Sequence, residues 1–237
     1  MKNTFKLTKL SCYFANLCMA SVFCLPPLLF LTFREMYGIS YTLLGTLVLV
    51  NFVTQLLIDL VFSFFSKHFN IHLTIRMMPL ITSVGLFIYA LSPLLFPNSV
   101  YIGLLLGTVV FSISAGLCEV LVSPVIAAIP SDNPQKDMSF LHSLYAWGVL
   151  MVVIISTLFF NIFGAHNWQY LAMFFAALPI IAAVLLSIAP MPDMDMSGET
   201  GKSGQKSKML GLVLCFGCIF FGSAAENTMS NWLSGFM

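Results

Sequence analysis

Long apolar stretches alternate with short polar ones along the whole chain. Apolar runs of 18 or more residues are typical of helices that cross a membrane, because a spanning helix needs about 20 apolar residues. The alternating segments of about ten residues that mark a transmembrane barrel are absent from the sequence. The pattern therefore predicts seven spanning helices, at 10–33, 41–65, 73–96, 100–129, 139–163, 168–189 and 209–237.

The longest polar stretch divides these helices unequally. Residues 190–208 are rich in Gly, Ser, Pro and charges of both signs, which is typical of a solvated linker. The other connections, such as 97–99 and 164–167, are short and force successive helices to pack antiparallel. We therefore expect a six-helix bundle over 1–189, a cytoplasmic linker over 190–208, and over 209–237 the first helix of a second bundle.

Composition indicates a chain embedded in lipid, and the distribution of basic residues predicts its orientation in the membrane. Hydrophobic residues make up 59% and charged residues 8% of the chain, against about 25% charged residues in a soluble domain. All basic residues except Arg34 fall on one side of the predicted membrane, which places the N-terminus in the cytoplasm and the chain in the cell membrane as a multi-pass protein. The sequence contains no stripe of basic residues of the kind that binds nucleic acid, so no nucleic-acid partner is expected. The basic residues on the N-terminal side are Lys2, Lys6, Lys9, Lys67, Arg76, Lys136, Lys202, Lys206 and Lys208.

Small residues within the spans are best explained by helix packing. The six cysteines all lie inside predicted helices, where a thiol behaves as a small apolar group. Cys215 and Cys218 have CxxC spacing, but no second ligand pair accompanies them, so no metal or redox site is expected. Gly103 and Gly107 form a small-xxx-small pair and predict a close helix contact.

Motifs of enzymes are absent from the sequence. It contains no glycine-rich phosphate loop, no HExxH and no GxSxG. We therefore expect neither an enzymatic activity nor a cofactor.

Three carboxylates, Asp59, Glu119 and Glu226, lie inside the apolar stretches. An acid near the centre of a membrane helix costs roughly 2.5 to 3.5 kcal/mol on insertion scales. Such a residue is first considered as part of a transport pathway or as a proton site.

Glu119 is the candidate for proton coupling. It lies about four or five residues past the midpoint of the fourth span, or about 7 Å along the helix axis. A proton-coupling group must exist in both protonation states, and removal from water favours the neutral form of a carboxylate. The alternative is a structural acid that forms a hydrogen bond with a neighbouring helix.

Asp59 and Glu226 are candidates for the pathway or its gating. Asp59 follows Gln55 by one helical turn and Asn51 by two, so the three share one face of the second span. This polar face either lines the pathway or locks a conformation, or it only holds helices together. Glu226, with Asn227 after it, lies near the middle of the last span and is expected to line a central cavity from the second bundle.

Four segments together resemble a known transporter family. They are GLCEVLVSP at 116–124, SFLHSLYAWG at 139–148, the stretch from Asn51 to Asp59, and the stretch at 225–232. With six spans, a basic linker and a seventh span, they resemble the major facilitator superfamily, and within it the fucose permease type of sugar:proton symporter. The resemblance covers nearly the whole chain but only somewhat more than the first half of a complete transporter.

The resemblance implies a fold and a function. The fold is an all-α membrane bundle of two inverted three-helix repeats, followed by the first helix of the second bundle. The function is movement of a sugar or similar small polar solute by alternating access, coupled to protons. Helices 8–12 of a complete transporter would supply the rest of the cavity, so the 237-residue chain alone is not expected to transport.

Some positions depart from the family pattern. The segment 63–72, SFFSKHFNIH, lacks the Gly-x-x-x-Asp-x-x-Gly-Arg-Arg pattern of the family's cytoplasmic loop. The first span has no acid where the fucose permease has one, so Asn16 and Ser21 are its polar candidates. The fifth span lacks the Gly-Pro-rich signature of drug:proton antiporters. The alternatives are an efflux antiporter for drugs or metabolites, and a membrane scaffold or receptor without transport activity.

Recognition of a sugar requires aromatic rings against its apolar face and amides or acids for its hydroxyls. Aromatic residues also gather at membrane interfaces, which is the alternative for each ring here. His142, close to the cytoplasmic end of its helix, is better explained as an interfacial or hydrogen-bonded residue than as a proton relay. The candidates for substrate binding are Asn16, His142, Tyr145, Trp147, Asn227 and Trp232.

Overall fold

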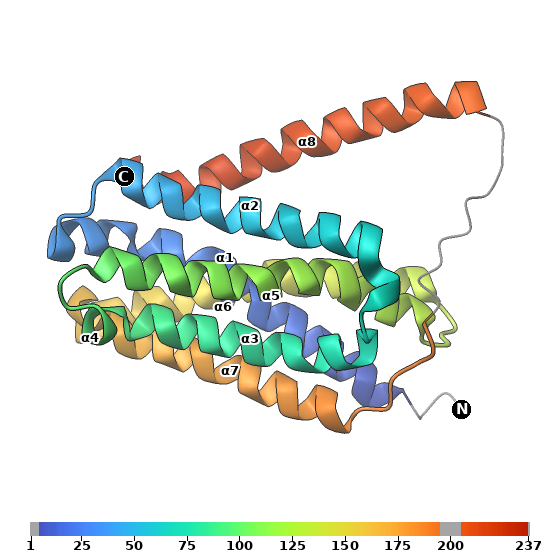
Figure 1. Cartoon of the computed structure of the whole chain (residues 1–237), viewed down its shortest axis with the longest axis horizontal. Helices are drawn as coiled ribbons and strands as arrows, with labels where there is room; N and C mark the ends of the chain where they lie inside the picture. The colour runs from blue at the N-terminus through green and yellow to red at the C-terminus, as the bar shows by residue number, and fades with distance from the viewer. Residues whose placement is uncertain (1–4, 195–204, 237) are drawn as a thin grey trace.

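The computed structural model of the chain describes residues 5–194 and 205–236, and every regular element in them is helical. Six of the helices are long and apolar enough to cross a membrane, so the chain is a multi-pass membrane protein (Figure 1). The elements are α1 (Lys6–Tyr37), α2 (Tyr41–Phe65), η1 (Ser66–His68), α3 (Ile71–Ala90), α4 (Ser92–Leu95), α5 (Val100–Ala128), α6 (Pro134–Phe163), η2 (Ala165–Asn167), α7 (Trp168–Ile188) and α8 (Gln205–Phe236).

The six spanning helices pack as two related sets of three. The helix α3 packs against α5 and α7, α2 packs against α5, and α1 packs against α6 and α7. When α1, α2 and α3 are exchanged with α5, α6 and α7, the α2–α5 contact becomes the α6–α1 contact, and α3–α5 becomes α7–α1. This correspondence is the arrangement that inverted three-helix repeats produce.

Glycines bring α3 and α5 into backbone contact. A Cβ atom added to Gly85 would lie 2.5 Å from the backbone nitrogen of Phe111, and one added to Gly107 would lie 2.8 Å from the Cβ of Tyr89. At Gly103 the added atom would lie 2.5 Å from the Cβ of Ser92. The close packing predicted for Gly103 and Gly107 is therefore confirmed.

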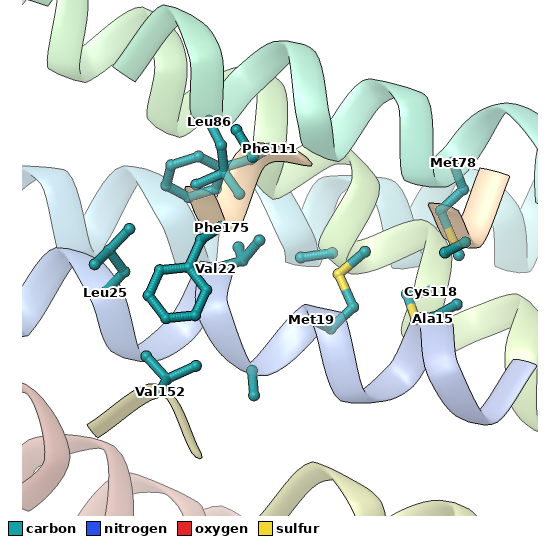
Figure 2. Packing of buried hydrophobic residues seen from close by; sticks show 14 of the residues in the cluster. Ala15, Met19, Val22, Leu25, Met78, Leu86, Phe111, Cys118, Val152 and Phe175 are labelled. Carbon is teal, nitrogen blue, oxygen red and sulfur yellow. The ribbon is translucent and has the colours of Figure 1, made fainter. Parts of the chain in front are cut away.

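Aromatic side chains fill the core where α1, α3, α5 and α7 meet. Phe33 packs edge-on against Trp168 with ring centroids 4.9 Å apart, and Tyr89 packs against Phe111 at 5.8 Å. All four rings are fully buried, and Figure 2 shows Phe111 together with Phe175 in the same core. By contrast, α2 and α6 bury only four residues each, so they flank this core and leave long faces uncovered.

Two of the predicted helix ranges needed correction. The third span, predicted as 73–96, is broken at Leu91, and a short helix α4 follows. Pro93 lies in the first turn of α4 and has no N–H to continue the hydrogen-bond ladder of α3. The fifth span was predicted from 139, but α6 begins at Pro134, where the side chain of Asn133 accepts a hydrogen bond from the backbone nitrogen of Lys136 at 3.1 Å.

The last helix, α8, lies outside the six-helix bundle and alongside α2 (Figure 1). It begins at Gln205, four residues before the predicted span, and it contacts α1. Most of its described side chains are exposed, and its described apolar stretch runs from Val213 to Met229. Part of the predicted linker, 195–204, lies outside the described residues.

Candidate functional site

A cavity of about 510 Å³ lies between α1, α2, α5, α6 and α8. Its wall combines polar and apolar side chains from all five helices, as is typical of sites for small molecules. Six of the candidates chosen from the sequence meet there. The lining residues are Asn16, Met19, Phe23, Phe52, Ala115, Cys118, Glu119, Val122, Ser123, Leu141, His142, Tyr145, Glu226 and Asn227.

Three polar residues of the bundle lie at a common depth in this cavity. Asn16, Glu119 and His142 are ten, nine and eight residues from the ends of α1, α5 and α6 that lie on the same side of the bundle (Figure 1). At 1.5 Å per residue, they lie about 12 to 15 Å from those ends. The side chain of Glu119 is exposed, and it faces the cavity rather than a packed helix.

Aromatic rings form one part of the wall. Phe23 of α1 packs edge-on against Tyr145 of α6, with ring centroids 5.8 Å apart and an interplanar angle of 80°. The phenol of Tyr145 lies within electrostatic range of both the Glu119 and the Glu226 carboxylates. Tyr145 thus lines the same cavity as the two acids, one from the bundle and one from α8.

Hydrogen bonds fix the α1–α6 side of the wall. The Asn16 amide nitrogen donates to the carbonyl oxygen of Leu141 at 2.8 Å. Nearer the helix ends, Lys9 forms an ion pair with Asp137, and the Tyr13 hydroxyl donates to the carbonyl oxygen of Asp137 at 3.2 Å. These contacts hold the early part of α6, which carries His142 and Tyr145, against α1.

A second cavity of about 270 Å³ adjoins the first. The two share Tyr145, Glu226 and Asn227, and the second adds Asn51 and Asn231. Polar side chains therefore continue from the first cavity toward the opposite side of the bundle.

Two of the three candidate residues on α2, Asn51 and Gln55, form side-chain hydrogen bonds. The Asn51 Oδ1 atom lies 2.7 Å from the Gln55 amide nitrogen and 2.6 Å from the Ser112 hydroxyl of α5, and both groups donate to it. Gln55 is buried and lines neither cavity. Asn51 has two roles. It connects α2 to α5 through its hydrogen bond with Ser112, and it also lines the second cavity.

Asp59 lines neither cavity. It is half-buried, and its Oδ1 atom is buried with no hydrogen-bond partner among the described residues. The Asp59 and Glu119 carboxylates are within electrostatic range of each other across the α2–α5 contact. Among the described residues, no three His, Cys, Asp or Glu side chains group as a metal site would require.

Two of the predicted aromatic residues lie away from these cavities. Trp147 is 58% exposed on α6. Trp232 packs against Phe30 of α1, with ring centroids 6.0 Å apart, and against Gly45 of α2. Neither tryptophan is among the residues that line the two cavities.

The sequence reasoning missed the phenylalanines of the wall and the serine bonded to Asn51. Phe23 and Phe52 are two of 23 phenylalanines, so residue type alone does not single them out. Their spacing carries a signal, because Phe23 follows Asn16 by seven residues, which is two helical turns and the same face. Ser112 precedes Glu119 by the same interval.

Comparison with solved structures shows the fold. The structure is similar to the xylose transporter XylE from E. coli in an inward-open conformation, with a TM-score of 0.67 and 15% sequence identity. The match covers 78% of this chain and 48% of the XylE chain, so this chain spans about half the length of that transporter. No protein-family model and no curated protein sequence matches this chain. The likeness establishes the major facilitator type of fold that the sequence predicted, and it does not extend to the fucose permease branch.

Proposed function

We propose that this chain forms the first bundle of a secondary active transporter that moves a sugar or similar small polar solute by alternating access, coupled to protons. The observation that carries the proposal is the cavity of about 510 Å³, in which two carboxylates, two amides, an imidazole and a phenol line one space. A cavity of this size fits a single small solute, since ligand pockets usually have volumes of about 300 to 1,000 Å³. The likeness to a xylose transporter agrees with such a solute.

Glu119 is the proposed proton site. A proton carrier must exchange its proton with water in one conformation and lose contact with water in the other. Glu119 meets the first requirement, since its side chain is exposed on the cavity wall.

The solute is proposed to contact Asn16, His142, Tyr145 and Asn227, which line the same cavity. Asn51 and Asp59 are proposed to act at the α2–α5 contact. A change in the packing of these two helices would alter the surroundings of the Glu119 carboxylate, which lies on α5. Trp147 and Trp232 line neither cavity, and they are proposed to contact the solute only if helices 8–12 of a complete transporter extend the binding site to them. The cavity lies nearer the side of the bundle that holds the N-terminus, which we propose to be the cytoplasmic side of the cell membrane.

Uptake of radiolabelled sugars into cells that express the full-length protein tests this proposal. Accumulation above the external concentration, abolished by a protonophore, is the expected result. Accumulation that persists with the protonophore would contradict the proposed coupling to protons. If the cells instead expel a hydrophobic dye, the protein is an efflux antiporter. If neither a sugar nor a dye moves, the scaffold alternative holds.

A further inference from the structure

Two carboxylates line the cavity, and no lysine or arginine of the described residues lines it with them. The carboxylates are those of Glu119 and Glu226. Lys9 is paired with Asp137 near the end of α1, and Arg34 lies over the ring of Tyr41 at 4.0 Å near the other end of α1. The one imidazole in the wall is that of His142.

Aromatic side chains line the cavity together with the two acids. Phe23, Phe52 and Tyr145 line both cavities, and Tyr145 lies within electrostatic range of Glu119 and Glu226. The face of an aromatic ring attracts a cation, and more strongly so when the pair is removed from water. Carboxylates together with aromatic faces are the surroundings in which proteins recognise organic ammonium groups.

We propose that the transported solute carries a protonated amine, as an amino sugar does, and that Glu226 pairs with it while Glu119 carries the coupled proton. This inference rests on the proposed transport function and narrows its substrate class. Within the described wall, a neutral sugar would offer the second carboxylate no counter-charge, and an unpaired charge removed from water is strongly unfavourable. An ammonium group supplies that counter-charge, and hydroxyl groups on the same solute would bond to Asn16 and Asn227, which line the same cavity.

Matched pairs of solutes test the proposal on the purified full-length protein. Binding of glucosamine and glucose, and of galactosamine and galactose, is measured by calorimetry at neutral pH. At least one amine is expected to bind about tenfold or more tightly than its neutral partner, because a charge-assisted bond replaces a neutral one. Equal or tighter binding of the neutral member of each pair overturns the proposal, and so does the absence of binding by both amines.

Variants of Glu226 test whether this acid is responsible for the preference for the amine over the neutral sugar. Glu226→Gln is expected to remove the preference for the amine, whereas Glu226→Asp, which keeps the charge, retains most of it. The matched control is Glu35→Gln at the exposed end of α1, which lines none of the cavities described above and is expected to leave the preference unchanged. A preference that survives in Glu226→Gln contradicts the role given to Glu226.

Transport by the same protein in proteoliposomes separates this inference from the proposed function. Amine binding without accumulation would leave the charge inference standing and refute transport. Accumulation of neutral sugars in preference to amines would leave transport standing and refute the charge inference.

Discussion

Replacement of Gly85 by alanine tests the helix contact that holds the two repeats together. The added Cβ would lie 2.5 Å from the Phe111 nitrogen and 2.9 Å from its Cα, so α3 and α5 would have to separate by about 1 Å to restore ordinary contact. Overpacking of this kind costs about 1 to 3 kcal/mol. The Gly107 contact is part of the same crossing, so we take the upper part of that range, reduced by about 1 kcal/mol for the higher helix propensity of alanine. The net loss of about 2 kcal/mol corresponds to a fall in Tm of about 4 to 8 °C.

The cysteines of the chain supply the assay. Cys12 and Cys118 are buried, so a thiol-reactive dye reports their exposure as the chain unfolds in detergent micelles. Cys215 and Cys218 are exposed and are first replaced by serine to remove background. The matched control is Gly222→Ala on α8, where an added Cβ meets no atom within 4 Å and Tm is expected to stay equal or rise. A Gly85→Ala chain as stable as this control would refute the close α3–α5 contact.

Three further predictions follow from the polar contacts. Ser112→Ala removes the hydroxyl that lies 2.6 Å from Asn51 Oδ1 and 2.5 Å from the carbonyl oxygen of Thr108 in its own helix, and it is expected to lower stability by about 1 kcal/mol, measured with the same dye. An equal loss in the Asn51→Ala background would mean that the bond to Asn51 does not join α2 to α5. A double-mutant cycle on Lys9 and Asp137 is expected to give a coupling of about 0.2 to 1 kcal/mol that decreases at 1 M salt, and a coupling insensitive to salt would contradict an ion pair partly open to water. Ser123→Cys is expected to react with a membrane-impermeant thiol reagent from the side that holds the N-terminus, and reaction only from the opposite side would contradict the proposed orientation of the cavity.

Much of the fold is predictable because a membrane imposes a simple rule on the sequence. Five predicted spans coincide with long helices apart from their ends, and at α6 the missed start carries a visible capping signal in Asn133 and Pro134. The break after α3 was missed because hydrophobicity continues through it, whereas Pro93 interrupts the backbone hydrogen bonds. Apolar periodicity alone does not record that interruption.

Six candidate residues chosen from the sequence line one cavity, but their contacts with other helices were not predictable. Glu119 stands out from the sequence because a carboxylate is rare in an apolar helix. Its electrostatic interaction with Asp59 depends on how α2 packs against α5, where Gly116 allows Ile58 to approach closely. Spacing along one helix predicts which residues share a face, but it does not predict which helix that face contacts. The hydrogen bond between Asn51 and Ser112 was therefore not predictable from the sequence.

The most direct test of the account is a comparison of two transport modes in the Glu119→Gln variant. A glutamine resembles the protonated acid but cannot release a proton, so proteoliposomes with the full-length variant should still exchange labelled solute for unlabelled solute across the membrane. They should fail to accumulate solute in response to a pH gradient, while the Glu35→Gln control does both. Proton-driven accumulation by the Glu119→Gln variant at the control's rate would contradict the assignment of Glu119 as the proton site.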